Sequence, residues 1–125
     1  MNKIISILIV SLALLGCNKE IDLKIENLTS ISVSVYKDHQ FIRKNNFGSG
    51  SKELDNLKAW LMNNKAGWDT YLATPAIGEV LVKGDGLTLN IGKDWAVVNY
   101  ASAEGEYSQL IKSINFNEFK YLYDI

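Results

Sequence analysis

The chain has 125 residues, with 13 basic and 14 acidic side chains that give a formal net charge of −1 at pH 7. Proteins that bind nucleic acid or anionic lipid by charge usually carry a basic surface or a polybasic segment, so this balance argues against both classes. Apolar residues make up 47% of the chain, which is enough for one small hydrophobic core, and the single cysteine excludes an intramolecular disulfide.

The first residues have the pattern of a secretory signal. Lys3 supplies a positive charge, and an apolar run over residues 4–15 follows it directly. The run has the length of a signal-peptide core. It is too short for a permanent membrane-spanning helix, which needs about 20 apolar residues. The pattern therefore predicts export of the chain.

The end of this run, Leu14-Leu15-Gly16-Cys17, resembles the lipobox of bacterial lipoproteins. The resemblance implies that the Cys17 sulfur is diacylglycerylated, that residues 1–16 are removed as a signal peptide, and that the new amino group is then acylated. Two or more acyl chains anchor a protein stably to a membrane where one chain does not. Lipoproteins retained in the inner membrane of enteric-type bacteria have aspartate after the cysteine. Asn18 stands there in this chain, which favours the outer membrane with the domain facing the periplasm.

The remaining sequence divides into a lipidated tether at residues 17–22 and a single domain at residues 23–125. The domain opens with a predicted strand over residues 23–36, because serines alternate there with Ile31, Val33 and Val35. A turn is expected at Lys37-Asp38-His39-Gln40, before a short apolar pair, Phe41-Ile42. The asparagine, glycine and serine content of residues 45–51 then predicts a loop.

A helix is predicted over residues 52–66. Ser51 can cap its start, and Leu54, Leu57 and Leu61 recur at helical spacing. Gly67 suits the position just after the helix end. A short strand over residues 69–74 is expected to follow.

The second half of the domain reads as an antiparallel meander over residues 79–114, since apolar residues alternate in short runs separated by turn signals. A second helix is predicted after it. Asn115 can cap that helix while Glu118 reaches back to complete a capping box. The expected fold is therefore α+β: an antiparallel sheet of about five to six strands, with two helices packed on one face and the other face solvated.

Catalytic chemistry finds little support in this sequence. His39 is the only histidine and falls in a polar turn, and the only cysteine is consumed by the lipid. Glu79, Asp85 and Asp94 lie in or beside predicted turns, where local backbone bonding explains an acidic residue. We therefore expect no catalytic residue, no metal site and no cofactor.

Binding has better candidates. Arg43 and Lys44 form a local basic cluster interleaved with Phe41 and Phe47, although a solvated hairpin tip is the simpler interpretation. Trp68 follows a helix-ending glycine and is a possible second contact, because tryptophan is enriched in interfaces. These five residues are the predicted partner-binding set, suited to an acidic protein or an anionic glycan.

Two functions remain open at this stage, and neither is enzymatic. The first is a periplasm-facing lipoprotein that binds and occludes a partner protein. Its size, anchor and lack of catalytic motifs are similar to those of immunity proteins that neutralise envelope-targeted toxins, a likeness of general features only. The second is an envelope-maintenance lipoprotein that binds peptidoglycan or another glycan through its aromatic residues.

Overall fold

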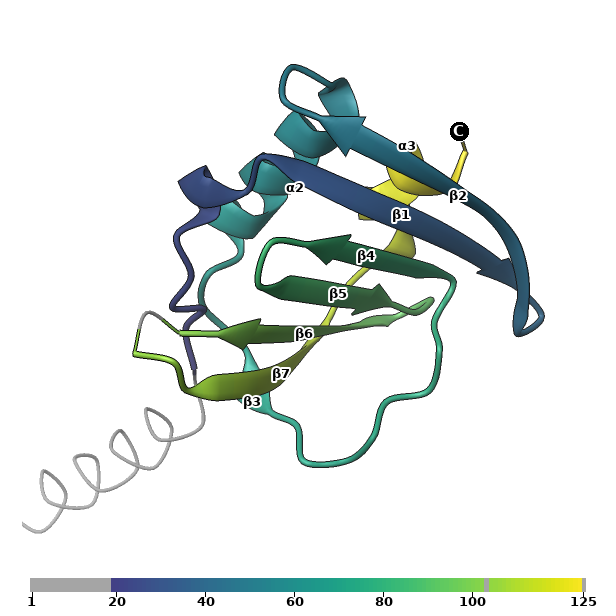
Figure 1. Ribbon diagram of the computed structural model, residues 1–125. Helices are drawn as coiled ribbons and strands as arrows, with labels where there is room; N and C mark the ends of the chain where they lie inside the picture. Colours follow the sequence, from purple (N-terminus) through teal and green to yellow (C-terminus); the bar gives the residue numbers. More distant parts are fainter. Residues whose placement is uncertain (1–18, 103, 125) are drawn as a thin grey trace, which may run out of the picture.

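The computed structural model describes residues 19–124, apart from residue 103 (Figure 1). The predicted signal peptide and Cys17 lie outside the described residues. Seven strands form an antiparallel sheet in the order β2-β1-β4-β5-β6-β7-β3. The strands are β1 Ser30–Lys37, β2 Gln40–Gly48, β3 Asp69–Thr70, β4 Val80–Gly84, β5 Leu87–Ile91, β6 Trp95–Ala101 and β7 Tyr107–Ser113. The helical elements are η1 Ile25–Asn27, α2 Lys52–Asn63, η2 Phe116–Phe119 and α3 Lys120–Tyr123.

One face of the sheet carries the hydrophobic core. Side chains on alternate positions of each strand share a face, and the pairing register aligns them across neighbouring strands. One such row crosses five strands and is buried throughout: Val33, Val82, Leu89, Val98 and Leu110. Strands β4 to β7 pair consecutively, which confirms the predicted meander.

Helical segments contribute side chains to the same core. Leu54 and Leu57 of α2 belong to one buried cluster with the strand residues, as do Phe119 and Leu122 near the C-terminus. Helix α2 begins where it was predicted, because the Ser51 hydroxyl oxygen accepts a hydrogen bond from the Leu54 N–H at 3.2 Å. A largely antiparallel sheet with accompanying helices agrees with the predicted α+β class.

The sheet has more strands than the predicted five or six, and strand β2 is longer than expected. Residues 45–48 belong to the expected loop at 45–51, but they continue β2 opposite β1, with Asn45 paired to Val33 and Phe47 to Ile31. Local composition favours a loop there. The β1 backbone offers a complete row of hydrogen-bonding partners, and this tertiary pairing overrides the local preference.

The chain also departs from prediction at four other places. Helix α2 ends at Asn63, before the predicted end at residue 66. Residues 23–29 do not join the first strand and include the short helix η1. The predicted strand over residues 69–74 is reduced to β3. The C-terminal helix begins as the 3-10 segment η2, and Glu118 does not complete a capping box but accepts a hydrogen bond from the Trp60 indole N–H at 2.7 Å. No helix in the described part of the chain is both long and apolar enough to cross a membrane.

The second face of the sheet was expected to be solvated, but a connecting segment covers part of it. Residues 71–79 join β3 to β4, and Asn90 on β5 holds this segment by two hydrogen bonds. Val97 on β6 is fully buried outside the main core cluster, and a small apolar hollow beside it is lined by Tyr71 and Pro75. Polar residues on this face therefore serve partly to dock the connecting segment.

Candidate functional site

The β1–β2 hairpin forms one edge of the sheet and projects beyond its neighbours (Figure 1). Its two-residue turn consists of Asp38 and His39, which have φ angles of 51° and 64°. Positive φ at both central residues is the geometry of the tight hairpin turn that matches strand twist. His39 is exposed in this turn, where the sequence placed it.

A β-bulge near the turn changes which side chains β2 exposes. The register shifts between Val35 and Tyr36, so that Arg43 pairs with Val35 while Phe41 pairs with Tyr36 and Ile42 is the extra residue. Phe41 remains 58% exposed and Ile42 50% exposed. The Tyr36 and Phe41 rings meet edge to face, with centroids 5.8 Å apart.

Exposed lysines flank these apolar side chains. Lys37 ends β1, and Lys44 lies on β2 opposite Ser34. We call Tyr36, Phe41, Ile42 and Lys44 the hairpin patch. Strand β2 pairs with β1 alone among the described strands, so the backbone N–H and C=O groups of its other edge have no strand partner there. The patch thus combines apolar area, positive charge and an open strand edge.

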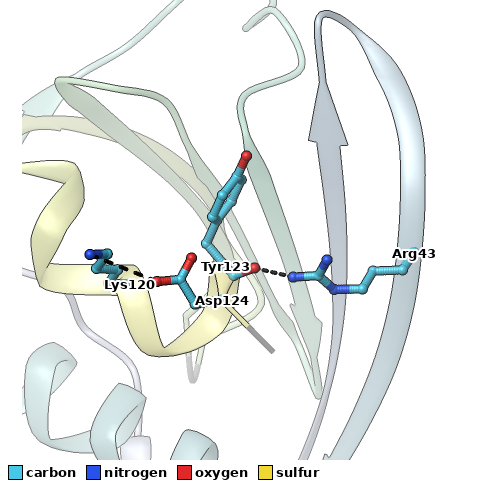
Figure 2. Close-up of polar contacts among 4 residues, drawn as sticks. All are labelled: Arg43, Lys120, Tyr123 and Asp124. Carbon is cyan, nitrogen blue, oxygen red and sulfur yellow. Dashed lines mark hydrogen bonds and ion pairs between the residues drawn. The ribbon is translucent and has the colours of Figure 1, made fainter.

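Arg43 was predicted to contact a partner, but the structure gives it an internal contact (Figure 2). Its side chain lies on the core side of β2, and its guanidinium donates a hydrogen bond to the Tyr123 carbonyl oxygen. The Arg43 Nε atom is buried and has no hydrogen-bond partner among the described residues. The charge of Arg43 therefore holds β2 to the C-terminal helix α3. Lys120, at the start of this helix, and Asp124, just after its end, form an exposed ion pair at 3.9 Å.

Trp68 was predicted as a second contact, and its burial corrects that expectation. The side chain is fully buried, and its indole N–H donates to the Asn64 carbonyl at 2.6 Å. It packs edge to face on Trp60, with ring centroids 6.1 Å apart. The left-handed conformation of Gly67, with φ 85°, turns the chain inward there.

Phe47 is also less available than predicted. It is half-buried and packs against the main core cluster, because its register position opposite Ile31 places it on the core face. Of the predicted partner-binding set, Phe41 and Lys44 are the exposed members. Ile42 was missed, although the adjacent apolar pair Phe41-Ile42 is a usable signal, since consecutive strand residues cannot both face one core.

The described residues hold no group of three or more histidine, cysteine, aspartate or glutamate side chains placed to bind a metal ion. Among the titratable groups of the described residues, Tyr121 is the one with a clear perturbation. Burial, and secondly the nearby charge of Glu118, raise the pKa of the Tyr121 phenol far above its usual value. Its hydroxyl has no hydrogen-bond partner among residues 19–124, residue 103 excepted. The arrangement can offer a binding surface, while the absence of catalysis stays a prediction.

Cys17, the predicted lipidation site, lies outside the described residues, so its acylation also stays a prediction. Comparisons of the chain with family models, with curated proteins and with solved structures each give no match.

Proposed function

We propose that this chain is a lipid-anchored protein of the bacterial envelope that acts by binding a partner protein through the hairpin patch. The partner would offer an apolar pocket bordered by carboxylates, because Phe41 and Ile42 are flanked by the cations of Lys37 and Lys44. An inhibitor of the immunity type, which neutralises an envelope-targeted toxin by covering a functional surface, needs only such a patch and an anchor.

The exposure of Phe41 and Ile42 carries this proposal. Large apolar side chains that remain outside the core mark interaction sites when they are grouped, and aromatic residues dominate interface energetics. The open edge of β2 could add backbone hydrogen bonds to a partner strand. The bulge and Lys44 are features that limit indiscriminate edge pairing, so we expect docking of side chains to provide the selectivity.

The position of the patch supports an anchored binding protein. The described chain begins at Lys19, which pairs with Trp68 close to the β7–β3 edge. The hairpin lies at the opposite edge of the sheet, and its turn lies at the far end of the strands (Figure 1). A lipid on Cys17 would therefore leave the hairpin patch directed away from the attachment point.

Recognition of a glycan has weaker support. Carbohydrate stacking needs exposed aromatic faces, and Trp60 and Trp68 are both in the core. Trp95 is half-buried, and Tyr107 is exposed at the other end of the sheet from the hairpin turn. We therefore argue for a protein partner, and glycan binding becomes one outcome of the test below.

Acylation is tested on Cys17. Cells that express the chain would be fed a clickable fatty acid, and we expect the label on wild type and its loss on Cys17→Ser. The reason is that the thiol is the diacylglyceryl acceptor in the lipobox pattern. Equal labelling of Cys17→Ser would contradict the anchor.

Partner binding is tested by photocrosslinking in cells. A photoreactive amino acid at position 42 should give an adduct with one protein, and the same probe at exposed Asp85, in the turn at the other end of the sheet, should not. Phe41→Asp with Lys44→Glu should abolish the adduct at position 42. Lys52→Glu, an exposed charge reversal on α2, serves as the matched control and should retain it.

Two results would contradict a protein partner at this site. An adduct that is dissolved by muramidase and resists protease would identify a glycan. Equal adduct yields at positions 42 and 85 would show that the hairpin patch has no special role.

A further inference from the structure

The segment that was expected to be a tether is folded into the domain from Lys19 onward. The Lys19 N–H donates to the Trp68 carbonyl at 2.8 Å, and the Trp68 N–H donates back at 3.2 Å. The Ile21 N–H donates to the Lys65 carbonyl at 2.8 Å, and the Ile21 side chain is buried in the core. The Asp22 N–H donates to the Tyr100 hydroxyl at 3.0 Å. These contacts leave no free tether after residue 18.

This attachment sets a short limit on the distance between lipid and domain. Asn18 is the only residue between Cys17 and Lys19. Two residues of fully extended chain span at most about 7 Å. An acylated Cys17 would therefore hold the surface around Lys19 at the membrane, because the domain cannot swing away on a flexible linker.

The surface around Lys19 carries the most exposed large apolar side chains of the described chain. Leu72 is 94% exposed and Tyr107 is 75% exposed. Both line the same open hollow of about 510 Å³ as Lys19, together with Tyr71 and Tyr100. An isolated leucine that points into water gains nothing for folding. Leucine and tyrosine do suit the boundary between lipid headgroups and acyl chains.

We infer that the domain rests on the bilayer surface, with Leu72 and Tyr107 inserted at the level of the lipid headgroups. This inference rests on the proposed acylation of Cys17. The contact is apolar and not electrostatic, since exposed Glu20 and Glu106 outnumber the single positive charge of Lys19. It should therefore depend weakly on salt and on the fraction of anionic lipid. It also fixes the orientation in which the hairpin patch faces the periplasm.

The test uses the full-length acylated protein in lipid vesicles. In Leu72→Cys and Tyr107→Cys the new thiol can be labelled with nitrobenzoxadiazole maleimide, because the Cys17 sulfur is blocked by its thioether. Lys37→Cys, at the end of β1 beside the hairpin turn, is the matched control. Vesicles would contain phosphatidylethanolamine and phosphatidylglycerol, and a second set phosphatidylcholine alone.

We expect the labels at positions 72 and 107 to emit at shorter wavelength, to be quenched by lipids with spin-labelled acyl chains, and to be several-fold less accessible to aqueous iodide than the label at 37. The effect should be similar in both lipid mixtures. Labels at 72 and 107 that are as accessible to iodide as the one at 37 would overturn the inference. So would labels at 72 and 107 that are shielded from iodide but are not quenched by the spin-labelled acyl chains, since that would indicate a protein contact.

Intact mass of the purified protein separates the two proposals. A mass that lacks the acyl groups on Cys17 would overturn the proposed anchor. It would also overturn the proposed orientation of the domain on the bilayer, which depends on that anchor. A correctly acylated protein whose position-72 label remains in water would overturn the orientation alone. Binding of a partner by the hairpin patch would be unaffected by that second result.

Discussion

Asn90 provides the sharpest test of how the second face of the sheet is built. It is a polar residue buried to 6% exposure on strand β5. Its side-chain amide donates to the Ala76 carbonyl at 2.7 Å and accepts from the Gly78 N–H at 2.9 Å. Gly78 lies so close to β5 that a Cβ atom there would come within 2.2 Å of the Ile91 carbonyl oxygen. Asn90 therefore fastens residues 71–79 to the sheet.

Replacing Asn90 by alanine should lower the free energy of unfolding by about 2 kcal/mol. Each of the two neutral hydrogen bonds contributes roughly 0.5–1.5 kcal/mol, which gives about 1–3 kcal/mol together. Ala76 is exposed and Gly78 is half-buried, so water can reach part of the released backbone. This access keeps the expected loss below the cost of fully buried, unsatisfied groups.

Equilibrium unfolding in urea of a chain that begins at Asn18 would measure the effect. Asn99→Ala is the matched control. Asn99 lies on the neighbouring strand β6, on the same face of the sheet as Asn90, and is half-buried, and the structure shows no hydrogen bond of its side chain among the described residues. That control should stay within about 0.5 kcal/mol of wild type. Asn90→Ala should also speed amide hydrogen exchange at residue 79, whose N–H donates to Ile91.

A result in which Asn90→Ala and Asn99→Ala have equal midpoints would refute the reasoning. It would mean that residues 71–79 are not held by the Asn90 side chain. Unchanged exchange at residue 79 would lead to the same conclusion.

Three further predictions concern the core and its polar groups. Leu57→Ala should lower the free energy of unfolding by roughly 2–4 kcal/mol and Val97→Ala by roughly 1–3 kcal/mol, since both side chains are fully buried. Variants whose urea midpoints equal that of the wild type would show that these side chains are not packed as described. Tyr121→Phe should leave the free energy of unfolding unchanged or raise it, because the buried Tyr121 hydroxyl has no hydrogen-bond partner among the described residues. Tyr100→Phe removes the acceptor of the Asp22 N–H and should cost about 1 kcal/mol. A lower urea midpoint for Tyr121→Phe than for Tyr100→Phe would contradict both expectations. Burial, followed by the charge of a nearby carboxylate, raises the pKa of Tyr121 above the usual value of about 10, so the unfolded chain releases this proton at a lower pH than the folded chain does. The wild type should therefore lose stability relative to Tyr121→Phe as the pH rises above about 10, and parallel profiles of stability against pH for the two proteins would contradict this.

The sequence by itself determined the elements whose patterns are local. Alternating serines and β-branched residues placed β1, and the spacing of Leu54 and Leu57 with the Ser51 cap placed α2. The turn at Asp38 and His39 and the meander from β4 to β7 followed from alternation and turn residues. Each of these signals is made by residues that are close together in the sequence, so no knowledge of distant partners was needed.

Only the tertiary structure decided which of the candidate binding residues are exposed. Arg43 is used internally because a bulge places it on the core side of β2, within reach of a carbonyl 80 residues later. Trp68 is buried because residues near the start of the described chain pair with it, and Ile42 is exposed because the same bulge removes it from the register. These outcomes depend on strand register and on contacts between distant segments. Such contacts are set by the packing of the whole domain, and apart from the adjacent apolar pair Phe41-Ile42 the local sequence carries no signal for them.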